Sequence, residues 1–73
     1  MKKILIFGGS GYVGSKLITT LLKKKYKVIN YDRDLFGNKH LPIKNKNFHH
    51  VHADVRNIKK IKQVLKKFEP SII

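Results

Sequence analysis

The 73-residue chain has no cysteine, no tryptophan and only two prolines, and it carries only four acidic residues. Without cysteine, neither a disulfide bond nor a thiolate metal site can reinforce the fold. This absence is compatible with the reducing cytoplasm, where we expect the protein to be. A chain of this length buries roughly 60% of its unfolded surface, so its hydrophobic core is thin. The composition therefore limits the chain to one small domain or a part of one.

Long apolar runs are also absent, since no stretch approaches the roughly 20 apolar residues that span a bilayer. The N-terminus imitates the start of a signal peptide, because two lysines precede the apolar residues Ile4–Phe7. This apolar run ends after four residues, at a glycine-rich segment. We interpret it as a buried strand, and we expect neither an export signal nor a membrane association.

Acidic residues are so few that the 17 lysines and arginines give a formal net charge of +13. Such a charge can attract nucleic acid, anionic membranes or phosphorylated metabolites. However, the lysines are scattered along the whole chain, and only two of the basic residues are arginine. Arginine is better suited than lysine to recognise phosphates or bases, because its guanidinium group can form two parallel hydrogen bonds. We interpret the charge as a solvated, lysine-rich surface and consider nucleic-acid binding the less favoured alternative.

Hydrophobic periodicity predicts strands that alternate with helices. The apolar run over residues 3–7 has the length of a strand and suits a parallel strand covered on both faces. From Tyr12 the period changes, and Val13, Leu17 and Leu21, with Ile18 and Leu22 beside them, form the stripe of an amphipathic helix.

The remaining elements are predicted in this order: a strand over 28–31 ending at Asp32, a loop over 33–47, a third strand over 48–53, a helix with its apolar face from Ile58 to Phe68, and the start of a fourth strand at 71–73. Asn57 is the expected N-cap of the second helix. The alternation predicts an α/β fold with a parallel sheet and right-handed crossovers. In such a doubly wound sheet the fourth strand lies beside the first.

Glycines at positions 8, 11 and 14 lie between the first strand and the first helix, in a G-x-x-G-x-x-G spacing. Gly8 allows a sharp turn off the strand. Gly11 allows the main chain to approach a pyrophosphate, and Gly14 allows the helix to pack tightly against the sheet. The free N–H groups of the first helical turn, together with the helix dipole, then face the phosphates. This spacing predicts a dinucleotide-binding turn.

An acidic residue at the end of the second strand strengthens this prediction. Asp32 follows Gly14 by 18 residues, close to the spacing of about 20 expected for a carboxylate that binds a ribose. A carboxylate accepts hydrogen bonds from a 2′-hydroxyl but repels a 2′-phosphate, which favours NAD over NADP. The adjacent Arg33 partly offsets that repulsion.

With these features the sequence resembles the extended short-chain dehydrogenase/reductases, the NAD-dependent epimerase/dehydratase family, which acts largely on nucleotide sugars. The resemblance rests on residues 8–14, Tyr31-Asp32, Leu35-Phe36-Gly37 and residues 53–57, and it covers essentially the whole chain. It implies that residues 1–73 are the N-terminal part of a Rossmann-type domain with three strands and the start of a fourth, and that the cofactor is NAD.

The resemblance also implies roles for individual residues. By position, the main chain of Ser10, Tyr12 and Val13 contacts the cofactor diphosphate, together with the three glycines. Asp54 and Val55, at the end of the third strand, lie against the adenine. Asp32 accepts hydrogen bonds from the adenosine ribose.

This chain departs from the family pattern at three positions. Phe7 replaces a threonine or small residue, and Ser71 replaces an aspartate. Lys25 stands where the family has a glycine in the left-handed conformation after the first helix. A non-glycine residue in that conformation costs on the order of 1 kcal/mol.

Catalytic residues are not predicted in this chain. In the family, the chemistry comes from a Ser or Thr and a Tyr-x-x-x-Lys pair beyond the fourth strand. Tyr12 and Lys16 have this spacing but lie on the predicted pyrophosphate helix. We therefore expect the NAD-binding portion of a nucleotide-sugar epimerase/dehydratase-like protein, with a nucleotide-sugar substrate only if a longer chain exists. The alternative is an autonomous nucleotide-binding or redox-sensing module without catalysis.

Four histidines raise the question of a metal site: His40, His49, His50 and His52. His50 and His52 point to the same face of the predicted third strand. Zinc sites need three or four ligands, and we find no cysteine and no nearby carboxylate cluster to complete one. We predict half-exposed strand histidines and no metal site.

Overall fold

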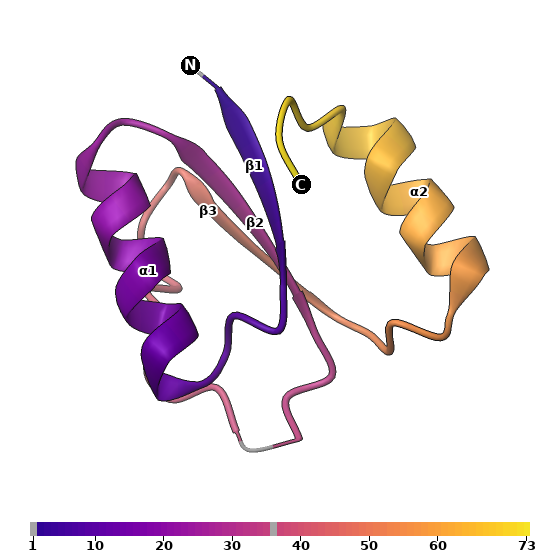
Figure 1. Ribbon diagram of the computed structural model, residues 1–73, viewed down its shortest axis with the longest axis horizontal. Coiled ribbons are helices and arrows are strands. Elements are labelled where there is room, and N and C mark those ends of the chain that lie inside the picture. The colour runs from indigo at the N-terminus through magenta and orange to yellow at the C-terminus, as the bar shows by residue number, and fades with distance from the viewer. Residues whose placement is uncertain (1, 36) are drawn as a thin grey trace.

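The computed structural model describes residues 2–35 and 37–73, and it has a parallel sheet with a helix on each face (Figure 1). The elements are β1 (Lys3–Phe7), α1 (Tyr12–Lys23), β2 (Lys27–Asp32), β3 (Phe48–His52) and α2 (Ile58–Phe68). This confirms the predicted order of elements and the α/β fold class. Met1, and Phe36 of the family motif, lie outside the described residues.

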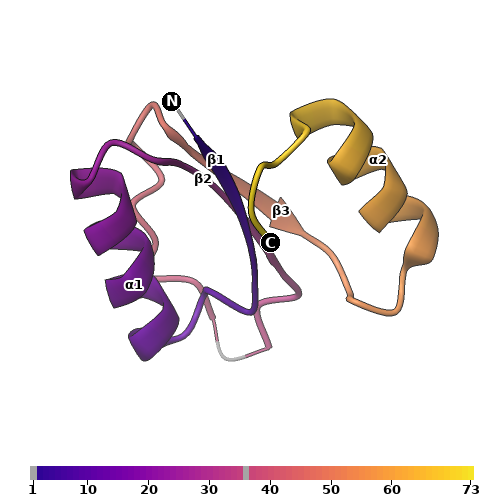
Figure 2. The same cartoon turned by 45° about the horizontal axis from the view of Figure 1, so that its top comes forward.

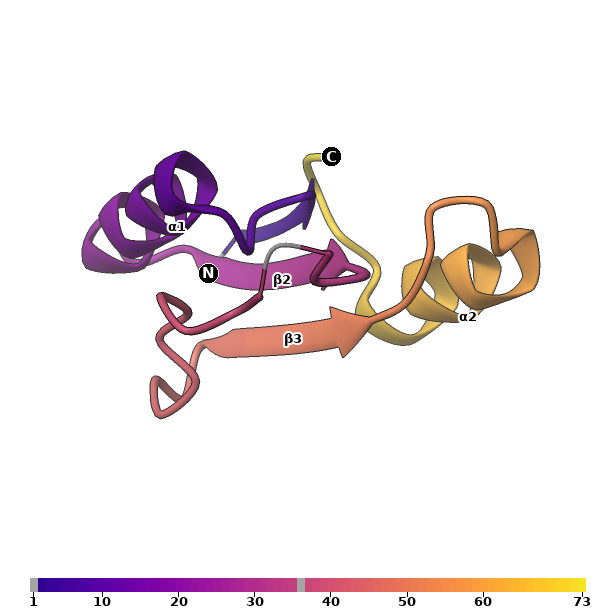
Figure 3. The same ribbon diagram turned by 90° about the horizontal axis from the view of Figure 1, so that it is seen from below.

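The strand β2 lies at the centre of the sheet, and the strand order is β1-β2-β3. Both pairs are parallel, and Figure 3 shows β2 and β3 running in the same direction. On the edge of β1 that faces away from β2, Ile72 forms a parallel bridge with Ile4. The N–H of Leu5 donates to the carbonyl of Ile72 at 2.9 Å. The C-terminal segment thus passes alongside β1 (Figure 2), where the fourth strand is predicted to begin.

The helix α2 covers one face of the sheet through an apolar cluster. Leu5, Ile29 and Tyr31 on the strands pack against Val64 and Phe68 on the helix. Tyr31 is fully buried, and its hydroxyl donates to the carbonyl oxygen of Asp54 at 2.7 Å. This cluster is one half of the core.

The helix α1 and the loop over residues 33–47 cover the other face. Ile18 packs with Val28 on β2, Phe48 on β3 and Leu41 in the loop. The loop has no strand or helix among its described residues, as predicted, yet it contributes a buried side chain to the core.

The buried face of α1 agrees with the predicted stripe at Ile18, Leu21 and Leu22, which pack into the core on this side of the sheet. It differs at Val13 and Leu17, which are 80% and 50% exposed, and at Ser15, which is buried. The start of the helix instead packs through two small residues, Gly14, which contacts Gly9 of the glycine turn, and the buried Ser15. A hydrophobic stripe does not reveal this, because small side chains permit a close approach without contributing hydrophobicity.

The helix ends follow local sequence rules. The N–H of Lys60 donates to Oδ1 of Asn57 at 3.0 Å, which confirms the predicted N-cap of α2. Lys25 has φ of 71°, which confirms the left-handed position implied for it after α1. Neither helix within residues 2–35 and 37–73 is long and apolar enough to cross a membrane.

Candidate functional site

The glycine turn leaves β1 in the predicted way. Gly8 has φ of 78°, in the left-handed region that favours glycine, and its N–H donates to the carbonyl of Tyr31 at 3.0 Å. The chain then reverses and enters α1 with Gly11 as the N-cap residue. The turn therefore lies at the carboxyl edge of the parallel sheet, where ligands bind in open α/β sheets.

Gly9 and Gly14 are in direct main-chain contact. A Cβ on Gly14 would lie 2.8 Å from Cα of Gly9, and a Cβ on Gly9 would lie 2.7 Å from Cδ1 of Ile18 and would collide with the side chain of Asn30. Gly14 was predicted to pack the helix against the sheet. Its nearest neighbour is instead Gly9, so it packs the helix against the glycine turn. Gly9, which the three-glycine spacing omits, is as tightly enclosed.

Among the described residues, the first turn of α1 presents N–H groups without a hydrogen-bond acceptor. The first four N–H groups of a helix have no partner within it, and Gly11 has no side chain to cap them. The first turn, which includes Tyr12 and Val13, contains no acidic residue. A Cβ on Gly11 would meet nothing within 4 Å, so the space before the helix is open. This end of α1 carries the positive pole of the helix dipole and attracts an anion.

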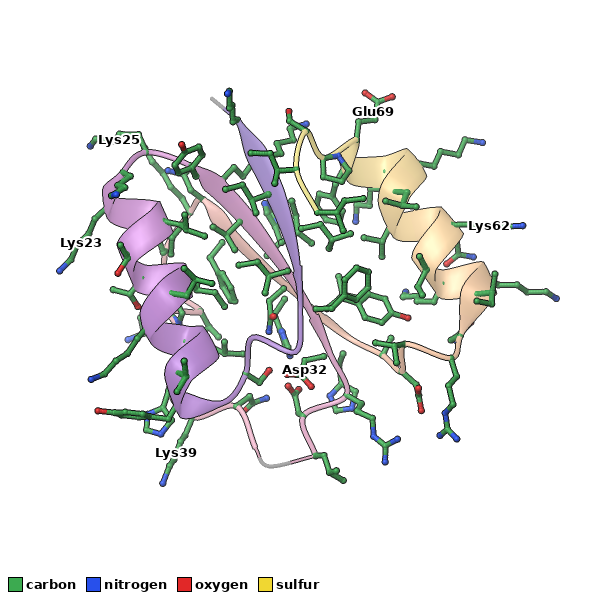
Figure 4. The ribbon with its side chains drawn as sticks, viewed as in Figure 1. Lys23, Lys25, Asp32, Lys39, Lys62 and Glu69 are labelled. Atoms are coloured by element: carbon green, nitrogen blue, oxygen red, sulfur yellow. The ribbon has the colours of Figure 1, made fainter. Side chains whose placement is uncertain are left out.

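Asp32 lies beside the glycine turn, at the end of β2 (Figure 4). Its Oδ2 accepts from the N–H of Ser10 at 2.9 Å, and its Oδ1 accepts from the N–H of Asp34 at 2.9 Å. The N–H of Ser10, which was expected to face the cofactor, therefore has a partner within the chain. Each carboxylate oxygen has a second lone pair that remains available to a hydroxyl donor.

Asn30 is a site residue that the sequence analysis missed. It is fully buried, and its Oδ1 accepts from the N–H of Gly9 at 2.8 Å. Its Nδ2 lies 3.1 Å from Oγ of Ser10 and 3.2 Å from Nδ1 of His50. A polar residue inside an apolar strand was the available signal, since a buried amide requires partners.

Asp34 connects the glycine turn to β3. The hydroxyl of Ser10 donates to Oδ1 of Asp34, while Oδ2 lies 2.8 Å from Nε2 of His50 and 3.0 Å from Nδ1 of His52. Burial raises the pKa of Asp34, but the hydrogen bonds from Ser10 and His50 outweigh it, so the pKa lies below its ordinary value. The sequence analysis found no carboxylate cluster near these histidines, but the turn after β2 brings one carboxylate, that of Asp34, to His50 and His52.

Asp54 forms an ion-pair cluster at the end of β3. It pairs with Arg56 at 2.7 Å and with Arg33 at 3.2 Å. The hydrogen bonds from Arg56, aided by the charge of Arg33, lower the pKa of Asp54 below its usual range. The next residue, Val55, is 54% exposed and available for an apolar contact.

A hollow of about 390 Å³ lies between the glycine turn and the loop after β2. Its lining residues are Gly8, Ser10, Gly11, Asp32, Arg33, Asp34, Leu35 and Gly37. The structure thus brings five of the predicted site residues to one hollow. Tyr12, Val13 and Gly14 continue from it into α1, and Asp54 reaches it through its ion pair with Arg33.

Tyr12 and Lys16 form a local contact on the surface of α1. The ammonium of Lys16 lies over the ring of Tyr12, 4.4 Å from the ring centroid, and His40 meets that ring edge-on at 5.6 Å. The contact is a cation–π interaction with the ring face.

A parallel sheet, a glycine turn that leads into a helix and a carboxylate at the end of the second strand define the chain as a Rossmann-type nucleotide-binding domain. Residues 4–73 match the NAD dependent epimerase/dehydratase family. The chain belongs to this family, as the resemblance of its motifs implied.

Individual relatives have the same fold. A short chain dehydrogenase from Leptospira borgpetersenii with bound NAD⁺ has a TM-score of 0.76 and 34% identity, covering 93% of this chain and 26% of that one. The enzyme WbmG from Bordetella bronchiseptica, in complex with NAD and UDP, has a TM-score of 0.87 and 25% identity, covering 94% and 23%. A 3-beta-hydroxysteroid dehydrogenase from Mycolicibacterium neoaurum is 48% identical over 31 residues, which are 42% of this chain and 8% of that protein. The chain thus spans about a quarter of the solved relatives and less of the curated one.

Proposed function

We propose that this chain is the NAD-binding portion of a nucleotide-sugar epimerase/dehydratase-like protein. The observation that carries the proposal is the uncapped N-terminus of α1, which opens beside the carboxylate of Asp32. The N–H groups of Tyr12 and Val13 bind the diphosphate, and Gly11 lets it approach without a steric barrier. Asp32 accepts from the adenosine ribose hydroxyls.

The charges around Asp32 support NAD over NADP. Asp32 repels a 2′-phosphate, and the neighbouring arginine that would offset this is engaged elsewhere. Arg33 pairs with Asp54 at 3.2 Å, so part of its charge is already neutralised. The preference for NAD therefore depends on this ion pair as well as on Asp32.

The end of β3 provides the surface for the adenine. Tyr31 holds the main chain of Asp54 through its buried hydroxyl, and the exposed Val55 supplies an apolar contact. In this proposal Asp54 and Val55 lie against the adenine ring, and the cofactor extends from there across the hollow to α1.

The nucleotide sugar belongs to the proposal for the whole protein. Family membership supports it, as does a solved relative that holds both NAD and UDP. The residues of this chain bind the cofactor, and sugar binding and catalysis are assigned to the part of the relatives that this chain does not match.

The substitution Gly11→Asp tests the cofactor site. The position is open, and its φ of −73° and ψ of 176° suit any residue. An aspartate there caps the helix, which stabilises it by roughly a few tenths of a kcal/mol relative to glycine, and places a negative charge where the diphosphate binds. We expect the melting temperature to stay equal or rise, while NAD affinity measured by calorimetry falls at least about tenfold.

The matched control is Asn57→Asp, which places the same charge at the N-cap of α2. It should leave NAD affinity unchanged. If Gly11→Asp binds NAD as tightly as the unsubstituted chain, the diphosphate does not lie at α1 and the proposal is overturned.

A further inference from the structure

We propose that Asp34, His50 and His52 form a binding site for a divalent transition-metal ion. His50 and His52 are two residues apart on β3, so both side chains project from one face of the sheet. The left-handed residue Asp34, with φ of 59°, carries its carboxylate back to them. One ligand atom from each residue lies within 4.8 Å of the other two.

The distances suit a metal after a small adjustment. Zinc binds imidazole nitrogen and carboxylate oxygen at about 2.0–2.2 Å, which places neighbouring ligand atoms of a tetrahedron about 3.3 Å apart. Oδ2 of Asp34 is now 2.8 Å from His50 and 3.0 Å from His52, so each of these two pairs needs to separate by a few tenths of an ångström, and the two histidine nitrogens lie within 4.8 Å of each other. The side chain of His52 is 69% exposed, which leaves it free to move and gives ions a path from solvent.

The donor set selects the class of metal. Two imidazoles and one carboxylate suit Zn²⁺, Co²⁺, Ni²⁺ or Fe²⁺ better than Mg²⁺ or Ca²⁺, which prefer oxygen ligands. Three protein ligands leave a fourth position for water. Asp32, which accepts from the N–H of Asp34, adds negative charge beside the site, whereas Asp54 is paired with Arg33 and Arg56.

Asn30 links this site to the glycine turn. Its Nδ2 faces Nδ1 of His50 at 3.2 Å, so Nδ1 accepts a hydrogen bond and the proton of the neutral ring is on Nε2, which donates to Asp34. A metal on Nε2 displaces that proton, and Nδ1 takes one up. The N–H at Nδ1 of His50 then points at Nδ2 of Asn30, which is also a hydrogen-bond donor. The side-chain amide of Asn30 must therefore rotate, and it loses its hydrogen bond to Gly9 or to Ser10.

A cobalt titration tests the site. Co²⁺ added to the chain without a polyhistidine tag should bind in a 1:1 ratio and give visible absorption bands, and Zn²⁺ should displace it. His50→Gln and His52→Gln should each weaken Co²⁺ binding at least about tenfold, as expected for loss of a ligand. Because His52 is largely exposed, its substitution leaves the fold intact.

The control is His49→Gln, on the same strand but on the opposite face, where His49 packs against Phe68 with ring centroids 5.2 Å apart. It should bind Co²⁺ as the unsubstituted chain does. Absence of 1:1 binding, or an equal loss in His49→Gln and His50→Gln, would overturn the metal site.

The link through Asn30 has its own test, which rests on the proposed NAD site. NAD affinity measured with saturating Zn²⁺ should be several-fold weaker than without it, and His52→Gln should abolish this difference. Because the cobalt titration contains no NAD, failure of the NAD site leaves its result intact. An NAD affinity that does not change with Zn²⁺ in a chain that binds both ligands would show that the two sites are independent.

Discussion

The two faces of the sheet differ along the same strands. On the face covered by α2, β2 presents Ile29 and then Tyr31, and both are buried in an apolar cluster. On the face covered by α1, Val28 is buried in the core, but the next two side chains on that face are Asn30 and Asp32. Because successive strand residues alternate between faces, one strand contributes to the core on one face and to the binding edge on the other.

The strand β3 repeats this difference. Phe48 is buried on the α1 face, and His50 and His52 follow it toward the carboxyl edge. On the other face, Val51 packs against the apolar cluster. The comparison indicates that stability depends mainly on the α2 face and binding on the far half of the α1 face. The two properties should therefore respond to different substitutions.

The largest effect on stability is expected for Phe68→Ala on the α2 face. Removing a buried phenylalanine costs about 3–5 kcal/mol, which is most of the stability that a small domain has. Urea unfolding followed by far-UV circular dichroism should show a largely unfolded chain. The control is Ile58→Ala on the same helix, where the side chain is 60% exposed, and its change should stay within about 0.5 kcal/mol. Similar unfolding curves for the two variants would contradict the assignment of stability to this face.

An intermediate effect is expected for Asn30→Leu. This change leaves the buried N–H of Gly9 without its acceptor and removes the partner of Ser10, at a cost of about 2–3 kcal/mol. Under conditions where the variant is folded, NAD affinity should fall at least about tenfold, since the glycine turn loses its anchor.

The neighbouring residue on the other face provides the control. Ile29→Val should cost about 0.5–1.5 kcal/mol and leave NAD affinity unchanged. If Asn30→Leu and Ile29→Val weaken NAD binding equally, the difference between the two faces does not hold.

The smallest effect is expected for Val13→Thr on α1. Val13 is 80% exposed, so a side chain of the same shape with a hydroxyl should change stability by no more than about 0.5 kcal/mol. NAD affinity should stay the same, since the proposed contact is through the main chain. Thermal unfolding that shows a clear loss of stability would mean that Val13 faces the sheet, as the hydrophobic stripe suggested.

The features that the sequence predicted well depend on local rules. The positive φ of Gly8 follows from the absence of a Cβ. The N-cap of α2 follows from the side chain of Asn57, whose partner lies three residues further along the chain. The position of Asp32 follows from the length of one β-α-β unit. Each of these requires only the neighbouring sequence.

The features that the sequence did not reveal depend on contacts between distant residues. Asn30 meets His50 because of the register between β2 and β3. Asp34 reaches His52 because a left-handed residue redirects the loop. Neither the register nor the loop path is encoded in a short pattern, so the polar network became visible only in the fold.

The contact between Gly9 and Gly14 determines at which step, folding or binding, the glycine turn loses its conformational entropy. Main chain is packed on main chain here, so no side chain lies between Gly9 and Gly14. The conformational entropy of these glycines is lost when the chain folds, and an arriving ligand does not have to order them. The contact between the two glycines is in this respect formed on folding, before the ligand of the turn arrives.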